Sequence, residues 1–233
     1  MSRWANKIAI VIGAGSHLGQ AITFALLKDG IHVTATDIEE GKMDKLKTTY
    51  ENMDKKDTLT GKLEFKYNIK DIEETFKKDV DILINNLNTF DIELTSYYDF
   101  MNDAIKSMRR RQVEGHIFNI NNIYGHFLPK KSLDNVLDKE GACLFNQYVA
   151  SEHANVALTH MVRCGVNGVK PPIRVTSISP SYLKTDISST ELPPLFYNFM
   201  GPEDVADAIL YALTLKSEVE ITELIIQPTG TLP

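Results

Sequence analysis

The feature that most constrains this chain is a short apolar run leading into closely spaced glycines near the start of the sequence. Residues 7–12 are a lysine and five apolar residues, which is typical of a strand buried on both faces. Gly13, Gly15 and Gly19 follow, and residues 20–28 have the apolar spacing of a helix. Backbone N–H groups and the positive end of such a helix face an anion, and glycine allows a close approach. The stretch therefore predicts the phosphate-binding turn of a dinucleotide fold.

Two residues qualify this prediction. His17 occupies the middle glycine of the pattern Gly-x-x-x-Gly-x-Gly; its side chain is expected to narrow the space for a pyrophosphate, although the ring could instead donate a hydrogen bond. Asp37 ends a second buried strand at residues 31–36, about 20 residues after the glycines, where an acidic residue can accept from ribose hydroxyls. It would repel a 2′-phosphate, so NAD is favoured over NADP if a dinucleotide binds at all. Alternatively, Asp37 caps a helix at residues 39–50, and both roles can hold.

The rest of the chain alternates between strand and helix patterns. Further strands are expected at residues 63–67, 81–86, 115–121, 173–178 and 224–227, and helices at residues 72–78, 97–111, 143–165 and 202–215. This alternation predicts an α/β fold with one doubly wound parallel sheet and helices on both faces. We expect a single Rossmann-like domain over residues 1–233.

Composition excludes several classes of protein. Hydrophobic residues make up 43% of the 233 residues, but no apolar run approaches the roughly 20 residues of a membrane span. The net charge of −6 disfavours nucleic acid and anionic membranes as partners. Cys143 and Cys164 have neither metal-site nor disulfide spacing, and the first strand begins too early for a signal peptide to precede it. We therefore expect a cytoplasmic protein without a metal site, and we expect the arginines at 109–111 to close a helix.

Several motifs occur in a recognisable order along the chain. They are Arg3-Trp4, residues 115–121, Gly125-His126, Ser179-Pro180, Lys184-Thr185-Asp186, residues 202–209 and residues 225–229. In this order, the chain resembles the short-chain dehydrogenase/reductase family over nearly its whole length, and most of all its insect farnesol-dehydrogenase-like members. The resemblance implies hydride transfer between a nicotinamide and an alcohol or carbonyl.

The same resemblance implies a catalytic tyrosine, a lysine four residues later that lowers the tyrosine pKa, and a serine that orients the substrate oxygen. Tyr148 matches the tyrosine, but Glu152 stands at the lysine position and Asn122 at the serine position. A carboxylate at 152 is expected to raise the pKa of Tyr148, which opposes its use as a base. An amide at 122 can still hold a carbonyl oxygen.

The resemblance also assigns cofactor contacts. Asn86 keeps an amide of the family's Asn-Asn-Ala-Gly turn, and Pro180 matches the proline beside the nicotinamide. The chain is shorter than the family pattern near residues 88–96, between the fourth and fifth strands, and a relay asparagine falls near Glu93. If a cofactor binds, we expect it to be NAD because of Asp37.

Three interpretations follow. In the first, the chain is a pseudoenzyme kept for binding an apolar small molecule such as a terpenoid or steroid, or for assembly as a homodimer or homotetramer through the helices at 97–111 and 143–165. In the second, it is an active NAD(P)-dependent oxidoreductase on such a substrate. In the third, Tyr148 and Glu152 exchange a proton in a lyase or isomerase, although we expect Glu152 to point into solvent. His116, His126 and His153 are expected to be structural.

Overall fold

The computed structural model describes residues 2–53, 59–67, 76, 79–87, 94–128, 139–184 and 199–230. The strands form one parallel sheet in the order β3-β2-β1-β4-β5-β6-β7. They are β1 (Ile8–Ile12), β2 (His32–Thr36), β3 (Leu63–Lys66), β4 (Ile82–Asn85), β5 (Gly115–Ile120), β6 (Ile173–Pro180) and β7 (Glu223–Ile226). The helices are α1 (His17–Lys28), α2 (Glu40–Asn52), α4 (Leu94–Arg111), the 3-10 turn η1 (Ile123–Gly125), α5 (Lys139–Gly165) and α6 (Pro202–Thr214).

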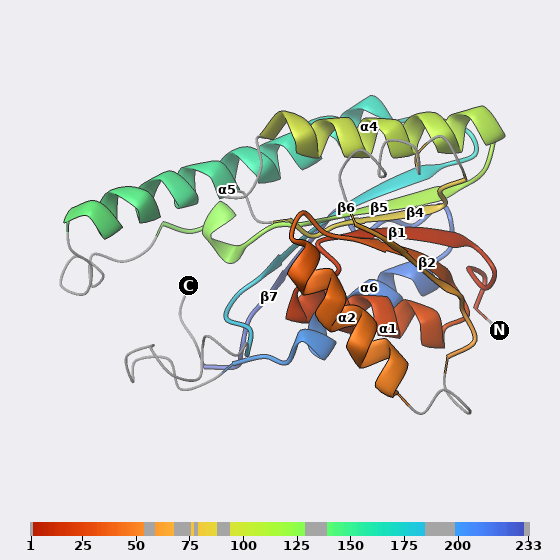
Figure 1. Cartoon of the computed structure of the whole chain (residues 1–233). Helices are drawn as coiled ribbons and strands as arrows, with labels where there is room; N and C mark the ends of the chain where they lie inside the picture. Colours follow the sequence, from red (N-terminus) through yellow and green to blue (C-terminus); the bar gives the residue numbers. More distant parts are fainter. Residues whose placement is uncertain are drawn as a thin grey trace.

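Helices cover both faces of the sheet. Figure 1 shows α1, α2 and α6 on one face and α4 and α5 on the other. Each face has its own hydrophobic core; Ile22 and Ile209 belong to the first core, and Met101 and Val162 to the second. β1, β5 and β6 lie inside the sheet and are almost completely buried, which explains the apolar, mostly β-branched sequence of β1. The predicted doubly wound fold is confirmed.

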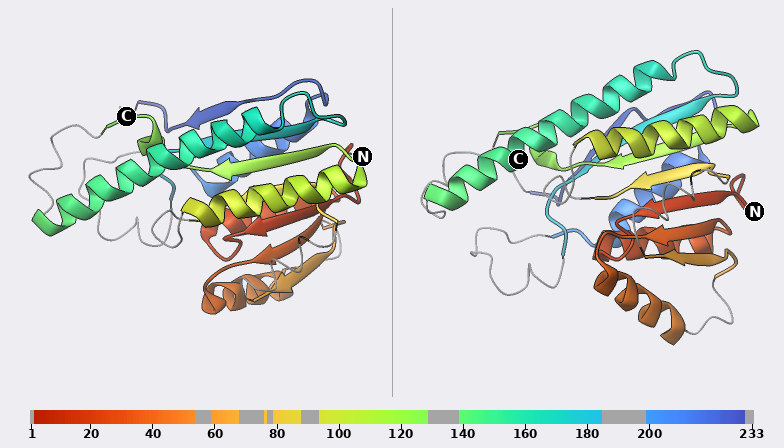
Figure 2. Two further views of the ribbon diagram at one scale, coloured as in Figure 1. Left: turned by 90° about the horizontal axis from the view of Figure 1, so that it is seen from above. Right: turned by 45° about the horizontal axis from the view of Figure 1, so that its top comes forward.

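The predicted elements are present among the described residues, with shifted ends. α4 begins at Leu94, one turn before the predicted start at Tyr97, because a helix can continue beyond the apolar stripe that reveals it. α5 likewise begins at Lys139 rather than at Cys143, and Figures 1 and 2 show its N-terminal part projecting past the carboxyl ends of the strands. The predicted helix at 72–78 lies outside the described residues except for Phe76, and much of the shortened stretch at 88–96 does as well.

The arginines at 109–111 close α4, as predicted, but they are not all solvated. Arg111 donates to Asp81 at 2.9 Å, and its side chain is 18% exposed, whereas Arg109 reaches the Gly165 carbonyl at 3.1 Å from the surface. The last turn of α4 is thereby tied both to the start of β4 and to the end of α5.

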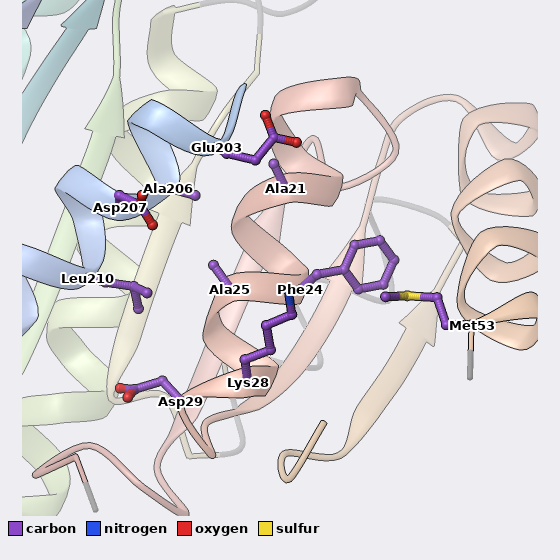
Figure 3. A pocket seen from close by; sticks show the side chains of 10 residues that line it. All are labelled: Ala21, Phe24, Ala25, Lys28, Asp29, Met53, Glu203, Ala206, Asp207 and Leu210. Atoms are coloured by element: carbon purple, nitrogen blue, oxygen red, sulfur yellow. The ribbon is translucent and has the colours of Figure 1, made fainter. Parts of the chain in front are cut away.

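α1 and α6 pack beside each other through small residues, and a groove of about 410 Å³ remains between them (Figure 3). Ala21 and Ala25 of α1 and Ala206 of α6 line it, with Glu203 at one end and Lys28 at the other. This groove belongs to the helix layer and contains none of the predicted site residues.

Candidate functional site

The glycine turn is held by close backbone packing. Gly13 has a φ of +73°, and a Cβ there would lie 1.9 Å from the carbonyl oxygen of Asn86. The Asn86 side chain donates to the Gly13 carbonyl and to the Ser16 hydroxyl, both at 3.0 Å. Asn86 therefore organises the turn, and its amide nitrogen is engaged by the protein itself.

Most described N–H groups of this turn already have protein acceptors. Ala14 donates to the Thr36 carbonyl at 3.0 Å, and Ser16 donates to the Gly13 carbonyl at 3.4 Å. Ser16 caps α1, because its hydroxyl accepts from the Gly19 N–H at 3.0 Å. These three N–H groups of the turn are thus bonded inside the chain.

Asp37 is also engaged by the protein. Its two carboxylate oxygens accept from the Gly15 N–H at 3.0 Å and from the Glu39 N–H at 3.1 Å, and the residue is only 3% exposed. The alternative role as the cap of α2 is wrong: Glu39 is the N-cap residue and α2 begins at Glu40. Asp37 instead joins the glycine turn to the start of α2.

Helix α2 lies directly on the glycine turn. A Cβ at Gly15 would lie 2.5 Å from Cβ of Lys42, 2.7 Å from its carbonyl carbon and 2.9 Å from its carbonyl oxygen. Gly13, Ala14 and Gly15 are all buried, whereas His17 is exposed at the first position of α1. In this arrangement Lys42 packs against Gly15, and Gly15 and the Asp37 carboxylate are bonded to each other and buried, so neither is exposed to a nucleotide. The narrowing assigned to His17 stays a prediction.

The second group of predicted residues surrounds Tyr148 on α5. Glu152, one turn further along, is only 4% exposed, so the expectation that it points into solvent is wrong. The cause is η1: a Cβ at Gly125 would lie 2.7 Å from Val156 and 3.0 Å from the carbonyl oxygen of Glu152. The close approach of η1 to α5 encloses this turn of the helix.

Burial, the Glu152 carboxylate and Tyr124 together raise the pKa of Tyr148 well above its usual value, with burial the largest cause. A tyrosine that acts as a base needs the opposite shift. At neutral pH, Tyr148 is therefore a neutral phenol that donates or accepts hydrogen bonds.

Asn122 caps η1. Its side-chain oxygen accepts from the Tyr124 N–H at 3.0 Å, so this amide oxygen stabilises the loop after β5. The Tyr124 hydroxyl lies 2.7 Å from the Tyr182 hydroxyl, which brings the residues after β5 and after β6 together. Burial and Tyr182 raise the pKa of Tyr124, so it too is a neutral phenol. Pro180, the last residue of β6, is buried and lies two residues before Tyr182 in the sequence.

Aromatic side chains extend from this pair along α5. Phe145 meets the Tyr124 ring edge-on at 5.2 Å between centroids and lies 6.4 Å from the Tyr148 ring. Leu144, one turn before Tyr148 on α5, is 52% exposed, and Leu128, which follows η1 in the chain, is 74% exposed. The Tyr148 region is therefore apolar and aromatic, with a few hydroxyl groups.

Beneath α5, an amide network ties the helix to the sheet. The Asn119 amide nitrogen lies within hydrogen-bond reach of Asn121, Asn155 and Thr159, at 3.2, 3.1 and 2.7 Å. Asn121 in turn donates to the Ser177 hydroxyl at 2.8 Å. These buried bonds fix the position of α5 over β5 and β6.

A histidine–carboxylate cluster lies at the β7 edge of this network. Glu223 lies 3.1 Å from Nε2 of His126 and 3.4 Å from Nε2 of His160. Arg163 donates to Nδ1 of His160 at 2.8 Å, and since arginine only donates, the proton of a neutral His160 sits on Nε2 and faces Glu223. That proton prevents Nε2 from ligating a metal. Among the described residues no group of three or more potential ligands has metal-binding geometry.

The other two histidines that we expect to be structural, His116 and His153, also contact the surrounding protein. Nδ1 of His153 lies 2.9 Å from the Val149 carbonyl, one turn back on α5. His116 is completely buried on β5, with Nε2 2.8 Å from the Thr176 hydroxyl. Burial, Arg174 and Arg3 lower the pKa of His116 far below its usual value, so it is neutral. His126 has a lowered pKa as well, because burial outweighs the opposing effect of Glu223.

The structure thus brings the predicted residues together as two groups. One comprises the glycines with His17, Asp37 and Asn86, and the other comprises Tyr148, Glu152 and Asn122. Sequence reasoning missed Lys42 and the Tyr124–Tyr182 pair, since only the placement of α2 and η1 brings them to the site. No described helix has the length and apolar character needed to cross a membrane.

Comparison with known proteins shows the family of this chain. A family model described as short chain dehydrogenase matches residues 7–194. A farnesol dehydrogenase of Aedes aegypti is 31% identical over 254 residues, covering 99% of both chains, and dehydrogenase/reductase SDR family member 11 of Bos taurus is 28% identical, covering 98% of both. The solved structure of a short-chain dehydrogenase/reductase from Burkholderia xenovorans aligns with a TM-score of 0.73 at 20% identity, covering 97% of this chain and 96% of that one. With this match over most of its length, the chain belongs to the short-chain dehydrogenase family.

Proposed function

We propose that this chain has the short-chain dehydrogenase fold without its hydride-transfer chemistry, and that it binds an apolar small molecule beside Tyr148. The observation that carries the proposal is the burial of Glu152 one turn from Tyr148. A buried carboxylate at this place raises the phenol pKa, whereas the family's lysine would lower it. An acid/base tyrosine is thus turned into a hydrogen-bonding one.

The family uses NAD or NADP, and the fit of such a cofactor to this chain supports the same proposal. Several N–H groups of the glycine turn and the Asp37 carboxylate are engaged by the protein, and α2 packs against Gly15. If a dinucleotide does bind after a rearrangement, we propose NAD, because the Asp37 carboxylate would repel a 2′-phosphate.

The ligand class follows from the side chains around Tyr148. Phe145 and the exposed Leu144, one turn before Tyr148 on α5, offer apolar surface, while the phenols of Tyr124 and Tyr148 offer hydrogen bonds. We propose a terpenoid- or steroid-like molecule with one hydroxyl or carbonyl group. The Aedes aegypti relative, named for farnesol, an apolar terpenoid alcohol, supports this class.

The test combines turnover with direct binding. Purified protein is assayed with farnesol and NAD or NADP and, in the reverse direction, with farnesal and the reduced nucleotides, while farnesol binding is measured by calorimetry. We expect no nucleotide oxidation or reduction, together with saturable farnesol binding that Tyr148→Phe weakens about tenfold through the loss of one hydrogen bond. Turnover that disappears in Tyr148→Phe would overturn the proposal and establish the active oxidoreductase.

A second experiment separates the two missing catalytic groups from the missing cofactor space. In the double variant Glu152→Lys with Asn122→Ser, the family's residues stand beside Tyr148. If turnover stays absent and NADH does not bind, the glycine turn prevents nucleotide binding and thereby catalysis. If NADH binds and turnover appears, the residues at 152 and 122 alone account for the loss of catalysis.

We also propose self-assembly through α4 and α5, for which their exposed apolar side chains are the supporting observation. Met161 on α5 is 68% exposed and Tyr98 on α4 is 47% exposed. We expect a homodimer or homotetramer in light-scattering measurements, and Met161→Lys should shift the mass toward that of the monomer.

A further inference from the structure

We propose that α2 is a displaceable internal cover of the glycine turn, and that a nucleotide binds only to a form of this protein in which α2 has moved away from Gly15. The inference concerns this chain's own residues and does not depend on the identity of the apolar ligand. It predicts weak nucleotide binding that is caused by lack of space at the glycine turn rather than by loss of catalytic groups.

The first step is the contact itself. The atoms of Lys42 that face Gly15 include its carbonyl carbon and oxygen, which belong to the helix backbone. No rotamer change of the Lys42 side chain can therefore clear the turn. Only movement of the first turns of α2 exposes Gly15.

The second step is the hydrogen bonding of Asp37. Its carboxylate accepts from Gly15 on the turn and from Glu39 at the start of α2, so it fastens the cover at the point where it meets the turn. When α2 moves away, the bond from the Glu39 N–H is lost and one Asp37 oxygen becomes available beside Gly15. A carboxylate oxygen that faces the uncovered turn suits the hydroxyl groups of a nucleotide ribose.

The third step is how weakly α2 is anchored. Only Met43 and Leu46 are buried on α2, whereas α1 has six buried residues, α4 seven and α6 five. The Lys42–Glu39 ion pair at its start is solvent-exposed, whereas Tyr50 near its end packs against the core and meets the Phe65 ring edge-on at 6.0 Å. Among α1, α2, α4 and α6, helix α2 has the fewest fully buried residues, and we expect its first turns to open locally at the lowest cost.

The first arm of the test measures the contact. The backbone at Gly15 does not have a positive φ, so alanine can adopt its conformation, but the alanine Cβ would clash with Lys42. Gly41→Ala adds a Cβ to α2 without a clash, because a Cβ at Gly41 has nothing within 4 Å, and it should leave α2 exchange unchanged or slower. We expect faster hydrogen–deuterium exchange over residues 40–52 in Gly15→Ala alone. Unchanged exchange in that variant would overturn the contact and with it the proposal.

The second arm measures nucleotide access by NADH fluorescence. In Met43→Ala with Leu46→Ala the open fraction rises, and the apparent Kd for NADH should fall about tenfold for each tenfold gain in α2 exchange, because only the open form binds. A matched control is Ile105→Ala with Met108→Ala, which removes two buried side chains of α4 on the other face. The control should leave NADH binding as in the wild type.

Wild-type protein gives a measurement that needs no variant. At saturating NADH, amides of residues 40–46 should lose protection from exchange, because binding selects the open form. Saturable NADH binding with α2 fully protected would overturn the proposal, and so would a loosened α2 without any gain in affinity. Neither result would touch the proposal on Tyr148, which turnover tests separately.

Discussion

The buried carboxylate of Glu152 lies one helical turn from the phenol of Tyr148 and, after burial itself, is the main cause that raises the pKa of that phenol. We expect Glu152→Gln to lower this pKa, since the amide removes the negative charge that opposes the tyrosinate, while burial keeps the pKa above the ordinary value. Absorbance at the tyrosinate band during a pH titration measures the change, and Tyr148→Phe identifies which titration belongs to Tyr148. An unchanged titration in Glu152→Gln would contradict the placement of Glu152.

His116 should make the protein sensitive to mild acid. Thr176 uses its own hydroxyl proton on the Ile221 carbonyl, at 2.7 Å, so Nε2 of His116 must carry the ring proton that it donates to Thr176. A second proton would bury a cation near Arg174 and Arg3, which is why the pKa of His116 is lowered.

Because the unfolded chain binds that proton below about pH 6.5 and the folded chain does not, stability falls as the pH drops below this value, by up to about 1.4 kcal/mol per pH unit. Urea unfolding between pH 7 and pH 5 measures the slope. His116→Gln should reduce it, and an equal slope in the variant would rule out His116 as the source.

Gly19 and Gly41 should respond oppositely to the same substitution. A Cβ at Gly19 would lie 2.1 Å from the Gly13 carbonyl oxygen, whereas a Cβ at Gly41 meets nothing within 4 Å. We expect Gly19→Ala to cost about 2–3 kcal/mol through forced movement of the turn, and Gly41→Ala to stabilise α2 by up to about 1 kcal/mol. Denaturant midpoints compare the two variants directly.

The arginines that end α4 should differ in their contribution to stability. Arg111→Met leaves the Asp81 carboxylate, whose side chain is 5% exposed, without its ion-pair partner at 2.9 Å, and we expect a loss of about 2–3 kcal/mol. Arg109→Met removes only an exposed hydrogen bond to Gly165 and should cost less than about 1 kcal/mol. Equal unfolding free energies for the two variants would contradict the different environments of these arginines.

Much of the fold was predictable because its signals are local. The apolar run of β1, the glycine at position 13 and the alternation of strand and helix patterns depend on neighbouring residues. The burial of Glu152 was not predictable in this way, because it depends on η1, whose Gly125 comes from another part of the chain.

The same distinction applies to the site. The sequence places Asp37 correctly at the end of β2, but it reveals neither the bond from Gly15 to Asp37 nor how closely α2 packs on the turn. How closely α2 packs on the turn depends on the burial of Met43 and Leu46 in the core. This packing property cannot be read from the periodicity of the sequence.

The pairing of α1 with α6, and the bond from the Trp4 indole to the Leu213 carbonyl at 2.9 Å, bear on how this protein forms during synthesis. α1 leaves the ribosome long before α6, whose contact completes the packing of α1. At about 5–20 residues per second, the apolar face of α1 waits roughly 10–35 s for its partner. During that interval the nascent N-terminal half carries an uncovered face, so it is the part of the molecule that a ribosome-associated chaperone would meet.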